Sequence, residues 1–140
     1  MNRSHEYGLV MFEKGQEDLY VFERLANDPQ APPAAVGFHA QQAVEKFLKA
    51  VLSSRAVTYP RTHDLAMLLD LLRDHALPLP PHASQLPVLS PYGARLRYDR
   101  PLPAEDIAPL DRQWAHTCVR EVRAWAERLL AEQKKPPQKP

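Results

Sequence analysis

The chain has 140 residues, a net charge of +1 and a single cysteine, Cys118. Chains of this length commonly form one domain, and the nearly balanced charge gives no overall electrostatic reason to expect a nucleic-acid partner. One cysteine excludes an intramolecular disulfide and fits a reducing compartment. No apolar run approaches the ~20 residues that cross a bilayer, and the first residues lead into no apolar core of a signal peptide. We therefore expect a cytoplasmic protein with no membrane segment.

Proline divides the chain into segments. There are 15 prolines and only 4 glycines, and most of the prolines cluster at 29–33, 78–91, 101–109 and 136–140. Because proline lacks the backbone N–H and clashes with the preceding helical turn, these clusters indicate connectors. The segments between them carry apolar residues at helical spacing, and none alternates as a strand does. The sequence therefore predicts an all-α protein.

The first two predicted helices are the clearest. One spans about residues 10–26 and ends at Asn27-Asp28-Pro29, which is a helix-stopping sequence. The second spans about residues 33–53, and its apolar face is wide enough for the interior of a helical bundle. On this second helix Glu45 and Lys49 are four residues apart, which predicts a favourably oriented ion pair.

Three further helices are expected. A third helix covers about residues 64–75, with Thr62 as its N-cap and Asp64 in its first turn. A proline-rich connector then leads to a short helix over about residues 90–98, in which serine and proline occupy the first positions. The last helix is expected over about residues 104–132.

The last helix carries more apolar surface than one small bundle needs. Trp114, Val119 and Trp125 are the side chains that we expect at the surface of a self-complementary homodimer. The alternative is that this second apolar stripe packs inside the single chain.

An arginine- and tyrosine-rich stretch, Ser90 to Arg100, is the strongest candidate for binding chemistry. Tyr92, Arg95, Arg97 and Tyr98 combine planar guanidinium groups, which suit phosphate, with aromatic faces, which suit bases. The alternative is structural: Arg95 pairs with the aspartate four residues later, and the two tyrosines anchor the helix.

His39 and Lys46 extend the candidate site onto the second helix. They lie on one polar side, which we expect to face the arginine-rich stretch across a groove, where the imidazole of His39 could serve in proton transfer. In the alternative reading, the polar residues Gln41, Gln42, Glu45 and Lys46 fix the register between helices. The histidines and the cysteine show no metal-ligand spacing, and no phosphate loop is present, so we expect neither a metal nor a cofactor.

Three short signatures resemble the HEPN family of helical domains. They are the tract from Phe38 to Ala50, the sequence Thr62-His63-Asp64-Leu65, and Leu96-Arg97-Tyr98. The predicted helices form an up-and-down bundle of four longer helices plus one short helix over residues 1–132, which is similar to the fold of this family. Residues 133–140 contain no apolar side chain that could join a core, so we expect a disordered tail there. The resemblance also implies pairing of two domains through their helices.

The resemblance also bears on activity. HEPN ribonucleases carry an arginine separated from a histidine by four to six intervening residues. After Arg95 and Arg97 the corresponding positions, 100–102 and 102–104, hold arginine, proline, leucine or alanine. Leu96-Arg97-Tyr98-Asp99 looks instead like the Arg-Tyr-Pro signature of the branch that accompanies minimal nucleotidyltransferases, with Asp99 in place of proline.

This branch implies a non-catalytic accessory protein that dimerises, binds a nucleotide or RNA and partners a nucleotidyltransferase, as in a toxin–antitoxin pair. Two alternatives remain open at this stage. One is a metal-independent ribonuclease in which His39 or His63 replaces the missing histidine. The other is a purely structural protein-interaction bundle.

Overall fold

The computed structural model describes residues 3–95 and 109–134, with the side chains of 94, 95 and 134 left aside. The elements in chain order are α1 (Arg3–Ala26), α2 (Pro33–Ser54), α3 (Leu65–Asp74), the 3-10 helix η1 (Leu86–Leu89), α4 (Ser90–Arg95) and α5 (Arg112–Lys134). The described part of the chain contains no strand. The prediction of an all-α bundle is therefore confirmed.

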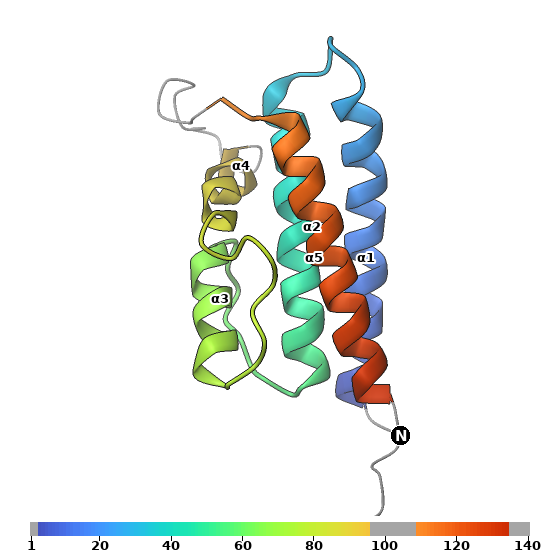
Figure 1. The fold of residues 1–140 in the computed structure, drawn as a ribbon, viewed down its shortest axis with the longest axis vertical. Coiled ribbons are helices and arrows are strands. Elements are labelled where there is room, and N and C mark those ends of the chain that lie inside the picture. The colour runs from blue at the N-terminus through green and yellow to red at the C-terminus, as the bar shows by residue number, and fades with distance from the viewer. Residues whose placement is uncertain (1–2, 96–108, 135–140) are drawn as a thin grey trace, which may run out of the picture.

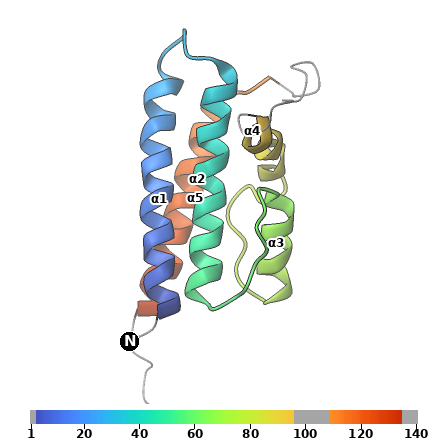
Figure 2. The same ribbon diagram turned by 180° about the vertical axis from the view of Figure 1, so that it is seen from behind.

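Helix α2 lies at the centre of the bundle. The long helices α1 and α5 pack on one side of it, and α3, η1 and α4 pack on the other (Figures 1 and 2). Because α2 has neighbours on several sides, most of its residues are buried, including Val44, Phe47 and Leu48. This arrangement explains why the apolar face of α2 is so wide in the sequence.

The three long helices do not simply alternate in direction. Helices α1 and α2 are antiparallel, but α5 runs in the same direction as α2 (Figure 1). Arg112 at the start of α5 donates to the carbonyl of Ala31 before α2, and Arg55 after α2 donates to the carbonyl of Leu129 near the end of α5. The chain achieves this because the connectors before α3 and before η1 return it toward the other end of the bundle.

The boundaries of α1 and α5 differ from the sequence-based expectation. Helix α1 begins at Arg3, seven residues before the expected start at 10. Helix α5 begins at Arg112 rather than at 104, because the side chain of Asp111 accepts the backbone N–H of Trp114 at 3.0 Å and caps the helix there. Helix α5 also continues to Lys134, two residues into the expected tail. The expected helical residues at 96–98 and 104–108 lie outside the described residues.

The ends of α3 follow capping rules that the sequence indicated only in part. Asp64, not Thr62, is the N-cap, and its carboxylate accepts the backbone N–H groups of Ala66 and Met67. Thr62 acts one step earlier, since its hydroxyl accepts the N–H of Asp64 at 3.0 Å. At the other end Ala76 has φ 55°, and the N–H of Leu77 reaches back to the carbonyl of Leu72 at 2.9 Å. This is the Schellman ending, built here on an alanine.

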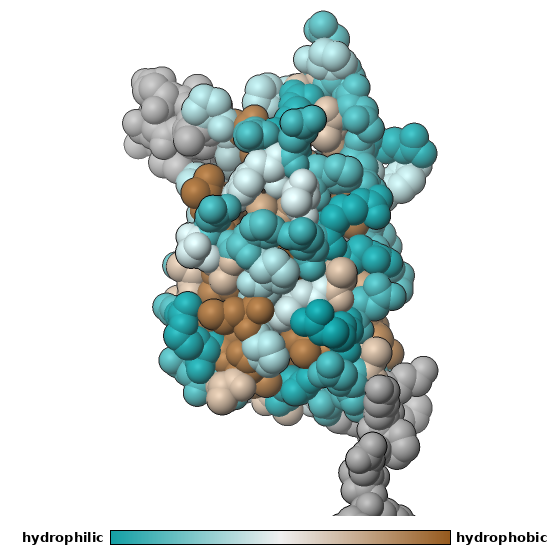
Figure 3. Space-filling view, in the orientation of Figure 1, coloured by the Kyte–Doolittle hydropathy of each residue, from teal (hydrophilic) through white to brown (hydrophobic). Residues whose placement is uncertain are grey.

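The surface is mixed in polarity. Figure 3 shows hydrophilic residues over most of one face, with hydrophobic residues gathered in its lower part, where α3 and the following connector lie. Met67 on α3 and Leu79 in the connector that follows it are exposed hydrophobic side chains. Among the helices that the structure describes, none combines the length and the apolar character needed to cross a bilayer.

Candidate functional site

Helix α4 is held against α2 by two close approaches. At Gly37 of α2, an added Cβ would lie 2.2 Å from Cδ1 of Tyr92, so the Tyr92 ring occupies the space that a larger residue would fill. At Gly93 of α4, an added Cβ would lie 2.5 Å from the side chain of Gln41. Each helix therefore supplies one glycine where the other projects a side chain, and α4 is positioned closely on α2.

The arginine- and tyrosine-rich stretch begins on this anchored helix. Tyr92 is only 4% exposed, which fits its alternative role as a helix anchor better than that of an open stacking face. The backbone of α4 is helical through Arg95. Arg97 and Tyr98 lie outside the described residues, so their role as candidates remains a prediction.

A buried polar cluster lies between α2 and the loop before α3; it consists of Gln41, Glu45, Lys49 and His63 and is called here the Glu45 cluster. One carboxylate oxygen of Glu45 accepts from Nε2 of Gln41 at 2.9 Å and contacts Nδ1 of His63 at 2.7 Å. The other accepts from Nζ of Lys49 at 2.9 Å, as the four-residue spacing predicted. Gln41 and Lys49 also donate to the carbonyls of His63 and Thr62, so the cluster fastens this loop to α2.

Glu45 remains ionised in this environment. Burial by itself raises the pKa of its carboxyl group, but the hydrogen bonds from Gln41, Lys49 and His63, together with the charge of Lys49, outweigh burial and lower the pKa below its ordinary value. An ionised carboxylate only accepts hydrogen bonds, so Nδ1 of His63 carries the proton that it shares with Glu45. The second ring nitrogen, Nε2, can then accept a proton, and the His63 side chain is 32% exposed.

His39 and Lys46 do not face α4, contrary to our expectation. Both contact Asp18 of α1: Nδ1 of His39 lies 3.0 Å from one carboxylate oxygen, and Nζ of Lys46 donates to the other. The residues of α2 that do meet α4 are Gly37 and Gln41. These lie on nearly the opposite side of the helix, because residues two positions apart are about 200° apart around a helix.

The three predicted dimer residues differ in how deeply they are buried. Val119 is fully buried and Trp125 is 1% exposed, and both belong to the core of the single chain. Assigning these two side chains to a homodimer surface was therefore wrong, because they already pack between α5 and the rest of the bundle. Trp114 is only partly buried, and its Nε1 donates to the side-chain oxygen of Gln85 at 2.9 Å.

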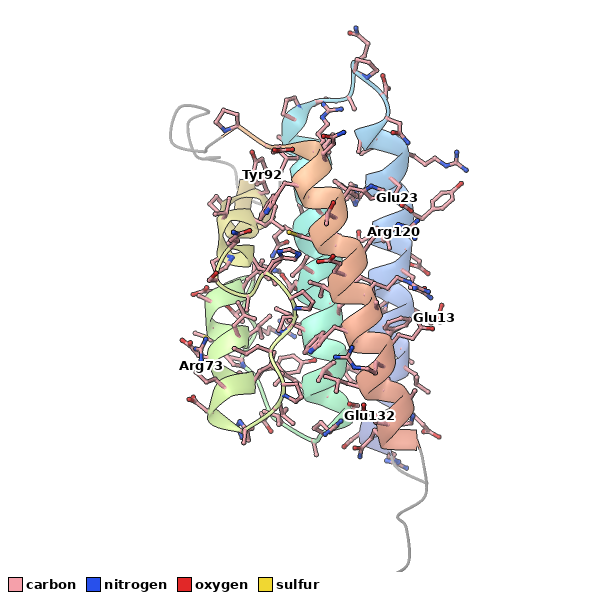
Figure 4. The ribbon with its side chains drawn as sticks, viewed as in Figure 1. Glu13, Glu23, Arg73, Tyr92, Arg120 and Glu132 are labelled. Carbon is pink, nitrogen blue, oxygen red and sulfur yellow. The ribbon has the colours of Figure 1, made fainter. Side chains whose placement is uncertain are left out.

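A second polar network joins α1 to α5. The guanidinium group of Arg112 donates to the carbonyls of Leu25, Ala26, Asp28 and Ala31, which caps the end of α1. Glu23 bridges His116 and Arg120, at 2.7 and 2.6 Å, and Figure 4 shows Glu23 and Arg120 meeting between the two helices. These groups are already engaged with one another, so the network holds the bundle together.

Sequence reasoning missed two residues that organise these sites. Asp18 had no signal, because its partners His39 and Lys46 are 21 and 28 positions away. Gln85 lies in the proline-rich connector, where nothing in the sequence indicated that it would meet Trp114. The contact of His63 with Glu45 spans 18 positions, so local spacing did not indicate it either.

The comparisons with known proteins identify the family. Within the described residues no group of three or more histidine, cysteine or acidic side chains is placed to hold a metal ion. No curated protein and no solved structure matches the chain. A family model described as HEPN domain matches residues 10–130, which is most of the chain and includes α2, the Glu45 cluster and α4. The chain therefore belongs to the HEPN family.

Proposed function

We propose that this chain is a non-catalytic HEPN accessory protein. In this proposal it forms a homodimer, binds a nucleotide, free or within RNA, and works beside a nucleotidyltransferase as one member of a toxin–antitoxin pair. In the same proposal the ligand's phosphate is bound by Arg95 and Arg97.

One observation carries the proposal. The arginines of the family's phosphate chemistry are present, but residues 100, 101 and 102, where histidine would follow Arg95, are arginine, proline and leucine. Membership of the HEPN family supports a function that involves nucleotides or RNA. The close packing of α4 at Gly37 and Gly93 supports it further, because it fixes the position of the helix that ends at Arg95.

The test measures RNA binding and RNA cleavage in the same sample. Purified protein is incubated with labelled mixed RNA in the presence of a metal chelator, beside an Arg95→Ala/Arg97→Ala variant. Retention of the RNA on a filter measures binding, and a denaturing gel of the same sample measures integrity. We expect wild-type protein to retain full-length RNA and the variant to retain much less, because two phosphate-binding groups are lost. Equal retention by both proteins contradicts the proposal.

A second candidate, metal-independent ribonuclease activity, is favoured by one specific contact. The 2.7 Å contact between His63 and ionised Glu45 orients an imidazole whose Nε2 can accept a proton from a 2′-hydroxyl group. His63 lies near α4, since Ser90 at the start of that helix accepts the N–H of Leu65 at 3.1 Å. Shortened RNA in the same gel, restored to full length by His63→Ala, would favour this candidate over the accessory role.

A further inference from the structure

The outer side of α1 carries apolar and charged residues in a regular pattern. A row of its side chains recurs at alternating intervals of three and four residues; these are Tyr7, Val10, Lys14, Glu17, Val21 and Arg24. We call this row the α1 seam. Intervals of three and four residues give the heptad spacing of helices that pair along their length.

The α1 seam faces away from the rest of the bundle. The buried residues of α1 lie outside the seam and pack toward α2 and α5. Tyr7 is 56% exposed and Val10 is 49% exposed, although both are large hydrophobic side chains. Helix α1 lies at the edge of the bundle in both views (Figures 1 and 2). Exposed apolar side chains in a row on such a helix are typical of a surface that another protein element covers.

The order of residues along the seam fits a second copy of the same helix. When two identical helices run antiparallel, a two-fold axis lies between them and every contact occurs twice. With this axis midway between Lys14 and Glu17, Lys14 of one copy faces Glu17 of the other, and Val10 faces Val21. The arrangement therefore joins opposite charges at the centre of the seam and apolar side chains on either side of them.

The ends of the seam are complementary as well. In the same arrangement Tyr7 faces Arg24 of the second copy, and a guanidinium group over a tyrosine ring makes a favourable cation–π contact. Arg24 already lies 5.0 Å from the centroid of the Tyr20 ring within the single chain. A parallel pair would instead place Lys14 beside Lys14 and Glu17 beside Glu17, which is repulsive. The charges of the seam therefore favour an antiparallel second copy.

We propose that the α1 seam is the homodimer interface of this protein, formed by two antiparallel copies of α1. This inference rests on the homodimer of the proposed function and specifies it, because it names the surface and the relative orientation of the two copies. It places the interface on α1 instead of on the predicted residues of α5, of which Val119 and Trp125 are buried in the single chain.

Charge reversal tests the pairing of Lys14 with Glu17. Sedimentation equilibrium gives the dimer dissociation constants of wild-type protein, Lys14→Glu, Glu17→Lys and the double variant. Each single reversal replaces two attractive contacts by two repulsive ones, so we expect the dimer affinity to fall by about 10- to 100-fold. The double variant exchanges the charges and should dimerise about as tightly as the wild type.

Arg128→Glu is the matched control for these variants. Arg128 is exposed on α5, outside the seam, and its reversal makes the same change in net charge as Lys14→Glu. It should leave the dimer dissociation constant unchanged. Circular dichroism checks that each variant keeps its helices, and we expect it to, because Lys14 and Glu17 are exposed in the single chain.

Cysteine cross-linking tests the orientation of the two helices. In the proposed dimer Val10 of one copy meets Val21 of the other, whereas the two copies of Val10 are roughly 16 Å apart along the helix axis, beyond the reach of a disulfide. Under mild oxidation, a mixture of Val10→Cys and Val21→Cys proteins should therefore form covalent dimers, and neither protein should do so alone. Cys118 is buried, and wild-type protein is the control for its reactivity.

The outcomes separate this inference from the proposed function. If the wild type is a dimer and the single charge reversals leave its affinity unchanged, the α1 seam is not the interface, while the homodimer of the proposed function stands. A double variant that stays as weak as the single ones contradicts the pairing of Lys14 with Glu17. Cross-linking of Val10→Cys to itself contradicts the antiparallel orientation. A wild type that is monomeric at every concentration contradicts both the inference and the proposed homodimer, and RNA retention then tests nucleotide binding separately.

Discussion

Glu45 is the residue on which the polar interior of this bundle depends. Its side chain is only 4% exposed, yet three donors from two segments surround the carboxylate. Taking a carboxylate out of water is costly unless its oxygens are paired. The low pKa of Glu45 indicates that the three partners outweigh this cost.

This balance predicts how stability changes in acid. The pKa of Glu45 is lower in the folded protein than its ordinary value of 4.5, so its contribution to stability is complete above about pH 4.5 and is lost as the pH falls through the folded value. Glu45→Gln should lower the free energy of unfolding by ~3 kcal/mol at pH 7. The difference in the free energy of unfolding between wild type and variant should become smaller below about pH 4.5. Urea denaturation at a series of pH values measures both quantities.

Glu23→Gln is the matched control for this prediction. Burial raises the pKa of Glu23, but hydrogen bonds from His116 and Arg120 lower it overall, and the side chain is more exposed than that of Glu45. Because solvent screens such a pair, we expect a loss of about 1 kcal/mol or less at pH 7. A loss from Glu23→Gln as large as that from Glu45→Gln would contradict the special role of the buried carboxylate.

At the residue scale, the sequence predicted only interactions within one element. The Glu45–Lys49 pair was predicted because spacing along a helix determines it. The contacts of Glu45 with His63, and of Asp18 with His39 and Lys46, join separate elements. They depend on how those elements pack, which no local spacing specifies.

At the scale of elements, α2 and α3 each end on an alanine with a left-handed backbone conformation. Ala56 and Ala76 follow α2 and α3 with φ 57° and 55°, in the left-handed region that favours glycine. Both endings nevertheless form, since the N–H of Val57 reaches the carbonyl of Leu52 at 2.9 Å and Leu77 makes the equivalent bond. Buried side chains nearby thus impose a conformation that alanine adopts only with strain.

Ala76→Gly should therefore stabilise the protein. Glycine adopts φ 55° without steric cost, so we expect the free energy of unfolding to rise by ~1 kcal/mol. Ala124→Gly, the same substitution at an exposed position within α5, should lower it by ~1 kcal/mol. Chemical denaturation of both variants checks the prediction, and a loss of stability in both would show that the ending of α3 is not strained.

The packing of α4 against α2 gives a second prediction at this scale. Glycine to alanine within a helix normally stabilises, but at Gly37 the new Cβ would lie 2.2 Å from Tyr92. We expect Gly37→Ala to cost ~1–3 kcal/mol through overpacking. In a Tyr92→Ala background the same change should be neutral or stabilising, because the obstructing ring is gone. A double-mutant cycle measures this coupling, and additive effects would contradict the close packing.

The helices themselves could be predicted from the sequence, but their exact limits could not. Proline clusters and apolar periodicity located α2 and α3 to within a few residues. The start of α5 was misplaced because helical periodicity continues through Leu110, whereas Asp111 caps the helix. The helical conformation of residues 3–9 was not predicted, because few of these residues are buried and the segment therefore has no apolar stripe.

At the scale of the whole molecule, the resemblance to the HEPN family was confirmed over residues 10–130. The candidate site was predictable only in part. The short helix that ends at Arg95 was found from the sequence, but a cavity beside it is formed by residues near η1, α4 and the start of α5, which are brought together by the fold. His39 and Lys46 were assigned to the wrong side because the neighbours of a central helix cannot be read from one helical pattern.

The proposed accessory role depends on nucleotide binding through Arg95 and Arg97. Isothermal titration of AMP and GMP into wild-type protein and Arg97→Ala, without metal, tests it most directly. We predict binding to the wild type, and an affinity at least ~10-fold lower for Arg97→Ala, because one charge-assisted contact to phosphate is lost. Equally strong binding in the variant would contradict the role of the arginine. No binding to the wild type would contradict nucleotide binding itself and favour a purely structural bundle.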